Sequence, residues 1–142
     1  MTIGCLFRDK PTSAVVTVSP DAPVSDAVRL LHDHRIGAVL AVGPDGVAGV
    51  VSERDVVRGL HKHGSAICDM PVHKVMSSPV VTVERSHTIS DALALMTERR
   101  FRHLPVVEGG VLIGIVSIGD LVKRKIDDAV REAEELRGYI HA

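Results

Sequence analysis

The sequence predicts an α/β fold built from two tandem β-α-β-β-α repeats that pack about an approximate two-fold axis. The pattern Gly, two apolar residues, Ser, two variable residues and Asp occurs at 49–55 and again at 114–120. A shift of 65 positions also superimposes the flanking strand-like, turn-like and helix-like patterns without a gap. Self-similarity at one fixed offset indicates a duplicated structural unit. Each half is too short for an independent core, so the two small sheets should pack together.

Composition favours a compact aliphatic protein over a nucleic-acid binder. Of the 142 residues, 45% are hydrophobic but only 2% are aromatic, and Trp is absent, so bases would find few rings to stack on. Seventeen Lys and Arg residues face eighteen Asp and Glu residues, for a formal net charge of -1, with no long run of either sign. A surface that binds polyanions is therefore not expected.

The N-terminal segment, residues 1–14, lacks the sustained apolar stretch of a signal peptide or a membrane span, because charged residues and a proline interrupt it. We therefore expect a soluble, cytoplasmic protein. Cys5 and Cys68 are isolated thiols without CxxC spacing, and both are expected to be reduced in such a compartment.

The first repeat, residues 15–65, contains five expected elements. A β-branched run ends at a Pro-rich turn, apolar residues then recur at helical spacing, and two apolar runs flank a Pro-Asp-Gly turn typical of a hairpin. In order, the pattern predicts a strand at 15–19, a helix from Val24 to His34 closed by Gly37, strands at 38–42 and 47–51, and a helix after Ser52 reaching about His63.

A connector at 66–79 leads into the second repeat at 80–125, which restarts with a strand at 80–83. The last helix continues into a C-terminal extension at 126–142. Its apolar residues step by four and three, which draws one stripe flanked by charge: Val122, Ile126, Ala129, Ala133, Leu136 and Ile140. This stripe suits either packing on the helix's own domain or a helix–helix contact between protomers.

The repeated corner has a structural and a functional interpretation. Ser52 with Asp55, and Ser117 with Asp120, match the capping box, in which the two side chains satisfy backbone amides at a helix start. Both pairs also follow the carboxyl end of a strand, where α/β folds bind ligands. A helix N-terminus attracts an anion, and a carboxylate can accept both hydroxyls of a ribose. Each corner is therefore suited to a nucleotide.

The residues opposite each corner are expected to differ between the repeats. In the segment Arg102-His103-Leu104-Pro105, the first two residues suit a phosphate and the last two offer an apolar surface to a base. The aligned segment of the first repeat, 37–40, is small and uncharged, so that repeat relies on Arg54 and Arg58 of its own helix. We expect the Asp120 corner to face Arg102 and His103.

Several segments resemble the tandem cystathionine-β-synthase-type (CBS) domain pair, also called a Bateman module. They are the doubled corner motif, the Arg-His-Leu-Pro-Val-Val segment at 102–107 and the Val-Met-Ser-Ser-Pro-Val-Val-Thr-Val entry at 75–83. Other segments are similar to the stand-alone CBS-pair proteins of bacteria and plant organelles: Arg35-Ile36-Gly37-Ala38, Ser52-Glu53-Arg54-Asp55, Arg102-His103, Ser117-Ile118-Gly119-Asp120 and the tail at 135–140. The resemblance covers roughly residues 15 to 125.

This resemblance implies a module without an attached enzyme that binds adenine nucleotides, such as AMP, ADP, ATP or NAD(H), and dimerises into a flat disc. It assigns the ribose to the two Asp residues, the ribose or phosphate to the two Ser residues, and the base pocket to Thr17 and Thr82. The expected nucleotide-binding residues are Thr17, Gly37, Ala38, Ser52, Arg54, Asp55, Arg58, Thr82, Arg102, His103, Leu104, Pro105, Ser117, Gly119 and Asp120.

Other chemistries find little support in the sequence. The pairs His32/His34 and His61/His63 fall on expected helices, where residues two apart point in different directions, so neither pair is expected to share a metal ion. No nucleophile elbow, Walker loop or dinucleotide-binding glycine motif is present. We therefore expect no catalytic residues, no catalytic cofactor and no metal.

The leading hypothesis is a regulatory, non-enzymatic module that senses an adenine nucleotide and transmits its binding to a regulated protein, as yet unidentified, by a conformational change. A homodimer is expected, and membrane or nucleic-acid partners are not. The alternative is a ligand-free scaffold for dimerisation or protein interaction.

Overall fold

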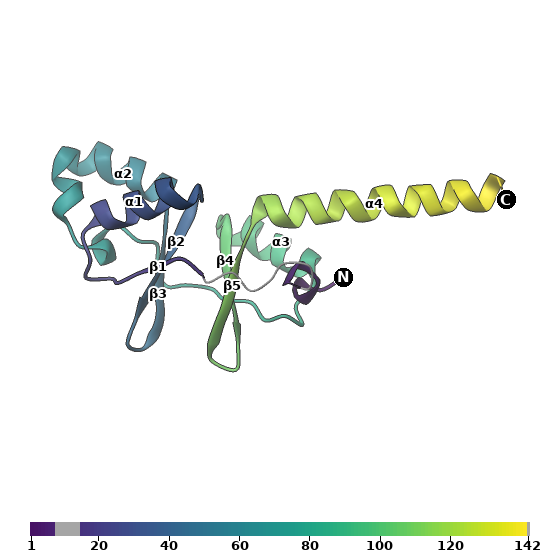
Figure 1. The fold of residues 1–142 in the computed structure, drawn as a ribbon, viewed down its shortest axis with the longest axis horizontal. Coiled ribbons are helices and arrows are strands. Elements are labelled where there is room, and N and C mark those ends of the chain that lie inside the picture. Colours follow the sequence, from purple (N-terminus) through teal and green to yellow (C-terminus); the bar gives the residue numbers. More distant parts are fainter. Residues whose placement is uncertain (8–14, 142) are drawn as a thin grey trace.

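The computed structural model describes residues 1–7 and 15–141, so part of the expected N-terminal segment and the last residue of the extension lie outside the described residues. The chain forms two units around small sheets, and a long helix continues from the second unit (Figure 1). The elements are η1 (Ile3–Phe7), β1 (Thr17–Val18), α1 (Val24–His34), β2 (Ala38–Gly43), β3 (Gly46–Ser52), α2 (Glu53–His63), η2 (Gly64–Asp69), η3 (Val72–Lys74), α3 (Ile89–Arg99), β4 (His103–Glu108), β5 (Val111–Ser117) and α4 (Ile118–His141).

Two small sheets form the centre of the molecule (Figure 1). In the first, β1 pairs in parallel with β2, and β2 pairs in antiparallel with β3. In the second, β4 and β5 form an antiparallel hairpin. The mixed α/β class is thus confirmed. The strand expected at 80–83 is wrong in extent, because only Val83 pairs, in a single parallel bridge to Val106.

The 65-residue offset holds down to local backbone detail. Both hairpins have a register irregularity at the same place, between Ala41 and Val42 and between Val106 and Val107. Helix α1 ends at Arg35 with φ of 52°, and α3 ends at Arg100 with φ of 58°. The prediction that Gly37 closes the first helix is therefore wrong, because a left-handed arginine two residues earlier already turns the chain.

A second internal repeat, which the sequence analysis missed, links the segments that precede each unit. The amide of Ile3 donates to the carbonyl of His87 at 2.8 Å, and the amide of Val72 donates to that of Ala22 at 2.8 Å. The same relation joins Thr2 to Thr88 and Pro71 to Pro23 by β-bridges. Residues 1–7 therefore complete the second repeat, just as residues 70–76 complete the first.

The core reflects this exchange of segments. Two hydrophobic clusters form, one in each repeat, where a shared core was expected. Ile3, from η1, is fully buried in the cluster of the second repeat, and Val72, from η3, is fully buried in that of the first. Each cluster packs its helices against the sheet through aliphatic side chains, as the low aromatic content requires.

Helix α4 leaves the body of the protein after its first turns, and Figure 1 shows it projecting beyond the second sheet. Leu121 is fully buried, but Val122 and Ile126 are 41% and 57% exposed. Every side chain from Ala129 to Ile140 is exposed. The interpretation that the whole stripe packs on its own domain is therefore wrong beyond the first turns.

Candidate functional site

The corner at Ser52 is a complete capping box. Strand β3 ends at Ser52, whose hydroxyl accepts a hydrogen bond from the amide of Asp55 at 3.3 Å. The Asp55 carboxylate accepts one in return from the amide of Ser52 at 2.9 Å. The amide of Glu53, the first residue of α2, donates to the carbonyl of Gly37 at 3.1 Å. Three amides at this helix start, those of Ser52, Glu53 and Asp55, are therefore already satisfied.

The corner at Ser117 repeats this geometry. The Ser117 hydroxyl accepts from the amide of Asp120 at 3.1 Å, and the Asp120 carboxylate accepts from the amide of Ser117 at 3.1 Å. The amide of Ile118 donates to the carbonyl of Arg102 at 2.8 Å. Both corners thus fulfil the structural interpretation of the motif, and any ligand contact is an additional role.

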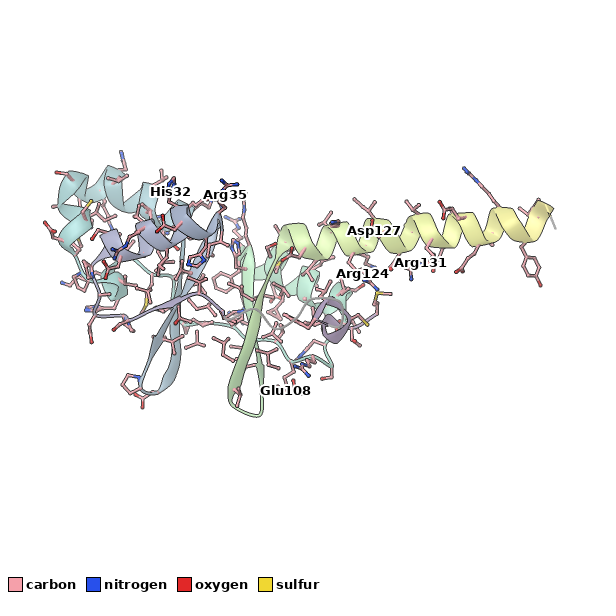
Figure 2. All side chains as sticks on the ribbon, in the orientation of Figure 1. His32, Arg35, Glu108, Arg124, Asp127 and Arg131 are labelled. Atoms are coloured by element: carbon pink, nitrogen blue, oxygen red, sulfur yellow. The ribbon has the colours of Figure 1, made fainter. Side chains whose placement is uncertain are left out.

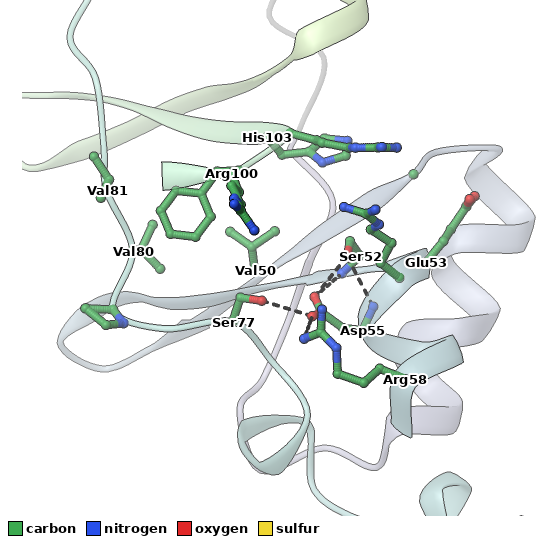
Figure 3. A pocket seen from close by; sticks show the side chains of 15 residues that line it. Val50, Ser52, Glu53, Asp55, Arg58, Ser77, Val80, Val81, Arg100 and His103 are labelled. Atoms are coloured by element: carbon green, nitrogen blue, oxygen red, sulfur yellow. Dashed lines mark hydrogen bonds and ion pairs between the residues drawn. The ribbon is translucent and has the colours of Figure 1, made fainter. Parts of the chain in front are cut away.

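The Asp55 corner lies in a cleft between the two repeats, with a volume of about 180 Å³ (Figure 3). The first repeat supplies the corner and the cations Arg54 and Arg58. The second repeat supplies the opposite wall, from residues 79–81 and from 100–103. The lining therefore combines the two carboxylates of Glu53 and Asp55 with several arginines and the apolar side chains of valines and a phenylalanine.

The Asp120 corner lies in a second cleft built by the reciprocal arrangement. The second repeat supplies Ser117, Asp120 and Lys123, and the first repeat supplies residues 15–16 and 35–38. Arg124 and Asp127 of α4 also line this cleft, and Figure 2 labels both together with Arg35. Within the described part of the chain, ten of the fifteen residues that line the Asp55 cleft have their counterpart, at the 65-residue offset, in the lining of the Asp120 cleft.

The expected pairing of walls and corners is right for His103, which lines the Asp120 cleft, and wrong for Arg102. Arg102 lines the Asp55 cleft and does not line the Asp120 cleft. The reason is that the two-fold axis brings the start of β4 against the start of α2, so that each corner faces the other repeat. The Asp55 cleft therefore contains Arg54, Arg58, Arg100 and Arg102, and it is the more strongly basic of the two.

Some of the remaining expected residues line a cleft, and others do not. Gly37 and His103 line both clefts, and Ala38 lines only the second. Leu104 is fully buried in the core of the second repeat, so the prediction that it offers a surface to a base is wrong. Three expected residues are exposed and line neither cleft: Thr17, Thr82 and Gly119. Pro105 is buried and lines neither cleft.

Valines next to Thr17 and Thr82 line the clefts instead. Val15 and Val16 line the Asp120 cleft, and Val80 and Val81 line the Asp55 cleft. Thr17 and Thr82 lie one position further along these segments, and both are exposed.

His103 occupies the position where the first repeat has Ala38, and it borders both clefts. Its pKa is lowered from the ordinary histidine value, chiefly because burial disfavours the charged imidazolium. The carboxylates of Asp120 and Glu53 act in the opposite direction, and Arg102 lowers the pKa further. An anion bound beside His103 would therefore favour its protonation.

Sequence reasoning missed several lining residues, of which Ser77 is the most informative. Its hydroxyl donates to the Asp55 carboxylate at 2.9 Å, and its backbone forms a two-bond bridge with Val50. Arg100 and Phe101, and their counterparts Arg35 and Ile36, were also not expected to line the clefts. The 65-residue offset could have identified these residues, if the wall opposite each corner had been taken from the other repeat.

Among the described residues, no group of three or more His, Cys, Asp or Glu side chains is arranged to bind a metal ion. Within the same part of the chain, no helix is both long enough and apolar enough to cross a membrane.

Comparison with known proteins agrees with this architecture of two repeats and two clefts. The CBS domain family matches residues 7–62 and 72–127. The chain belongs to this family. Its two matched segments correspond to the two repeats and to the two corners at which their final helices begin.

Relatives of this CBS-domain protein include stand-alone CBS-pair proteins. The mitochondrial CBS domain-containing protein CBSX3 of Arabidopsis thaliana is 34% identical over 147 residues, covering 98% of this chain and 71% of the relative. The crystal structure of the CBS-domain protein ATU1752 from Agrobacterium tumefaciens has a TM-score of 0.81 at 40% identity, covering 87% of this chain and 92% of that one. CBSX2, crystallised in complex with AMP, has a TM-score of 0.72 at 29% identity, covering 90% and 98%.

Proposed function

We propose that the protein is a regulatory, non-catalytic module that binds an adenine nucleotide, such as AMP, ADP, ATP or NAD(H), between its two repeats. The observation that carries this proposal is the composition of each cleft, in which one repeat supplies a carboxylate at a helix start and the other supplies a cation. The AMP complex of the similar protein CBSX2 supports the same ligand class.

Each part of a nucleotide has a chemical counterpart in these clefts. The carboxylate of Asp55 or Asp120 suits the two ribose hydroxyls, which are hydrogen-bond donors. Arg102 in one cleft, and Arg35 in the other, suit the phosphate, since a guanidinium donates in a bidentate manner to phosphate oxygens. The valines of residues 80–81 and 15–16 offer apolar surface to the base.

The regulatory mechanism would be linkage between nucleotide binding and the arrangement of the repeats. Because each cleft is lined by both repeats, a bound ligand contacts both and stabilises the arrangement in which both contacts exist. A regulated protein that recognises this arrangement would then respond to the nucleotide, and by reciprocity it would change the nucleotide affinity.

We further propose that the protein is a homodimer and that α4 contributes to the contact. The projecting part of this helix exposes Val130, Leu136 and Ile140, which are 52%, 64% and 77% exposed. Burying such side chains against a second helix is favourable, at about 25 cal/mol per Å² of apolar surface. A location in the cytoplasm stays a prediction from the sequence.

The same exposed helix favours one alternative, a ligand-free scaffold for dimerisation or protein interaction. Isothermal titration of the full chain with AMP, ATP and NADH distinguishes the two functions, and the nucleotide proposal predicts saturable heat with at least one of them. Thermal unfolding provides a second measurement, because a ligand at a hundred times its Kd stabilises the native state by about 2.7 kcal/mol. No heat and no stabilisation with any adenine nucleotide would favour the scaffold.

A further inference from the structure

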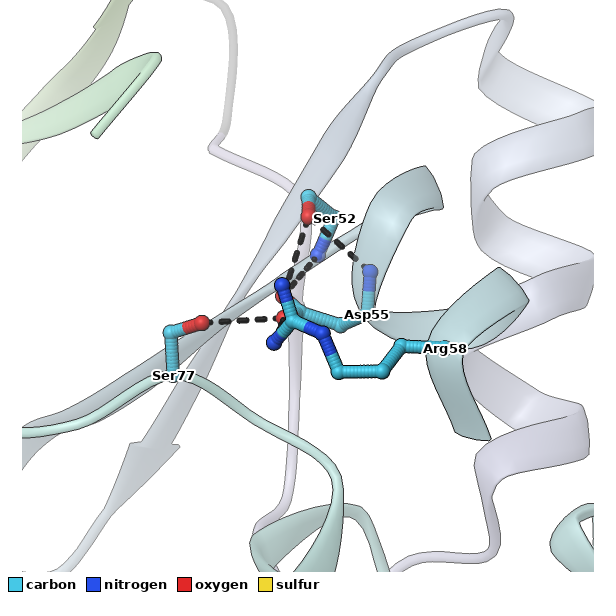
Figure 4. Close-up of polar contacts among 4 residues, drawn as sticks. All are labelled: Ser52, Asp55, Arg58 and Ser77. Atoms are coloured by element: carbon cyan, nitrogen blue, oxygen red, sulfur yellow. Dashed lines mark hydrogen bonds and ion pairs between the residues drawn. The ribbon is translucent and has the colours of Figure 1, made fainter. Parts of the chain in front are cut away.

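The two corners differ in how many hydrogen bonds their carboxylates already accept. An ionised carboxylate has about four lone-pair positions for hydrogen bonds. Asp55 accepts from the amide and the hydroxyl of Ser52 at its Oδ2 atom, both at 2.9 Å. Its Oδ1 atom accepts from the Ser77 hydroxyl at 2.9 Å and lies 3.5 Å from an Arg58 guanidinium nitrogen. All four positions of Asp55 are therefore used (Figure 4).

Toward the described residues, the Asp120 carboxylate uses little of its capacity to accept hydrogen bonds. Within residues 1–7 and 15–141, its carboxylate accepts one hydrogen bond, from the amide of Ser117 at Oδ2. The side chain of Asp120 is exposed to the cleft, whereas Asp55 is only 4% exposed. Two ribose hydroxyls need two acceptor positions, which Asp120 offers without any rearrangement and Asp55 does not.

Ser77 is the residue that makes this difference, because it is held where it contacts Asp55. The Ser77 amide donates to the Val50 carbonyl at 2.9 Å, and the Val50 amide donates to the Ser77 carbonyl at 3.1 Å. The backbone of Ser77 is bonded to β3 through both its amide and its carbonyl. Both positions at Oδ1 of Asp55 are taken, so a ribose that placed both hydroxyls there would displace the exposed Arg58 side chain and would also break the bond from the Ser77 hydroxyl to the charged carboxylate. Breaking such a bond weakens binding by roughly tenfold or more.

We propose that the Asp120 cleft is the one that binds the ribose of a nucleotide, and that Ser77 keeps the Asp55 cleft closed to ribose. This inference rests on the proposed function and adds which cleft binds and what restrains the other. The arginines of the Asp55 cleft attract phosphate, but they do not free a position on Asp55 for the ribose. Ser77 therefore acts as a specificity-determining residue for the number of nucleotides bound per chain.

The test is isothermal titration of the full chain with AMP as the probe. The wild-type protein should bind one AMP per chain, and Asp120→Asn should remove this event. Ser77→Ala should add a second binding event, or strengthen a weak second event by about tenfold. Ser65→Ala serves as the matched control, because Ser65 is exposed in η2 and lines neither cleft, and it should titrate as the wild type does.

The outcomes separate this inference from the function on which it rests. Two equal binding events in the wild type, unchanged in Ser77→Ala, would overturn the inference and leave nucleotide binding intact. So would an Asp120→Asn variant that still binds AMP as the wild type does. No heat from either the wild type or Ser77→Ala, with AMP or any other adenine nucleotide, would overturn both proposals.

Discussion

The corner at Ser52 and the corner at Ser117 share one backbone and differ in what surrounds it. Each has a reciprocal pair of serine and aspartate hydrogen bonds between 2.9 and 3.3 Å. At Asp55 a third segment, the connector with Ser77, adds a further donor and buries the carboxylate. Duplication thus preserved the part of the motif that caps a helix, while the segments packed against it decide what else the carboxylate can bind.

The largest difference should appear in the stability of alanine variants at the two aspartates. Asp55→Ala leaves the Ser77 hydroxyl and the Ser52 amide without their acceptor in a buried place, so the free energy of unfolding should fall by about 3 kcal/mol. Asp120→Ala removes a cap at an exposed site and should cost about 1 kcal/mol or less. Urea unfolding of both variants, without nucleotide, measures the difference.

Equal losses at Asp55 and Asp120 would contradict the description of these corners as unequal. Ser77→Ala provides an intermediate case, because it removes one of the donors to Asp55 and leaves the capping box intact. Its cost should lie near 1 kcal/mol, since the carboxylate keeps its other partners.

The next largest difference should appear in the stability of alanine variants at Gly49 and Gly114, which occupy the same place in β3 and β5. A Cβ atom at Gly49 would lie 2.5 Å from the sulfur of Met76 and 3.0 Å from the carbonyl oxygen of Ser77, and at Gly114 it would lie 2.6 Å from the ring of Phe7. Gly49→Ala should cost about 2–3 kcal/mol, because the Ser77 backbone is bonded to β3 and cannot retreat. Gly114→Ala should cost about 1–2 kcal/mol, since only the side chain of Phe7 must move.

Gly138 supplies the control for these substitutions. It lies in the exposed part of α4, and nothing lies within 4 Å of a Cβ atom built there. Gly138→Ala should therefore stabilise the helix by about 0.5–1 kcal/mol. Thermal unfolding of the three variants in parallel gives their order, and a larger loss at Gly114 than at Gly49 would show that the connector yields more easily than residues 1–7.

The smallest effect concerns His103, the histidine that breaks the symmetry between the clefts. Its pKa in the folded protein is below the unfolded value of 6.5, so the unfolded chain binds the proton more readily. The neutral imidazole therefore favours folding above pH 6.5, and this contribution is lost as the pH falls through the lower folded pKa. The stability difference between His103→Gln and the wild type should change between pH 8 and pH 5, and a constant difference would contradict this role.

Much of the fold could be predicted because the duplication left local signals in both halves. Apolar spacing located the helices, and the Pro-Asp-Gly turn located the first hairpin. The extent of the first strand of the second repeat was mispredicted. A β-branched run at 80–83 indicates only strand propensity, whereas the length of a strand also depends on the segment with which it pairs. The left-handed residues that end α1 and α3 could not be predicted either, because both are arginines, and arginine does not indicate that conformation in a sequence.

The sequence predicted the contacts within each repeat of the candidate site, but not the contacts that form between the two repeats. Residues within one motif, such as Ser52 and Asp55, are brought together by local helix geometry and could be paired from spacing alone. Arg102 approaches the other corner through the packing of the repeats, which no single segment encodes. Ser77 belongs to the connector, which lies outside the segments that the 65-residue offset superimposes.

The exchange of leading segments between the repeats has a consequence for how the chain reaches its native state. Residues 1–7 leave the ribosome well before the second repeat they complete, so Ile3 must wait for α3 and β4 to be synthesised. Contacts between such distant segments raise the contact order, which slows folding. The second repeat can then finish only with residues 1–7, which are joined to it through the first repeat, and the pair should fold as one cooperative unit.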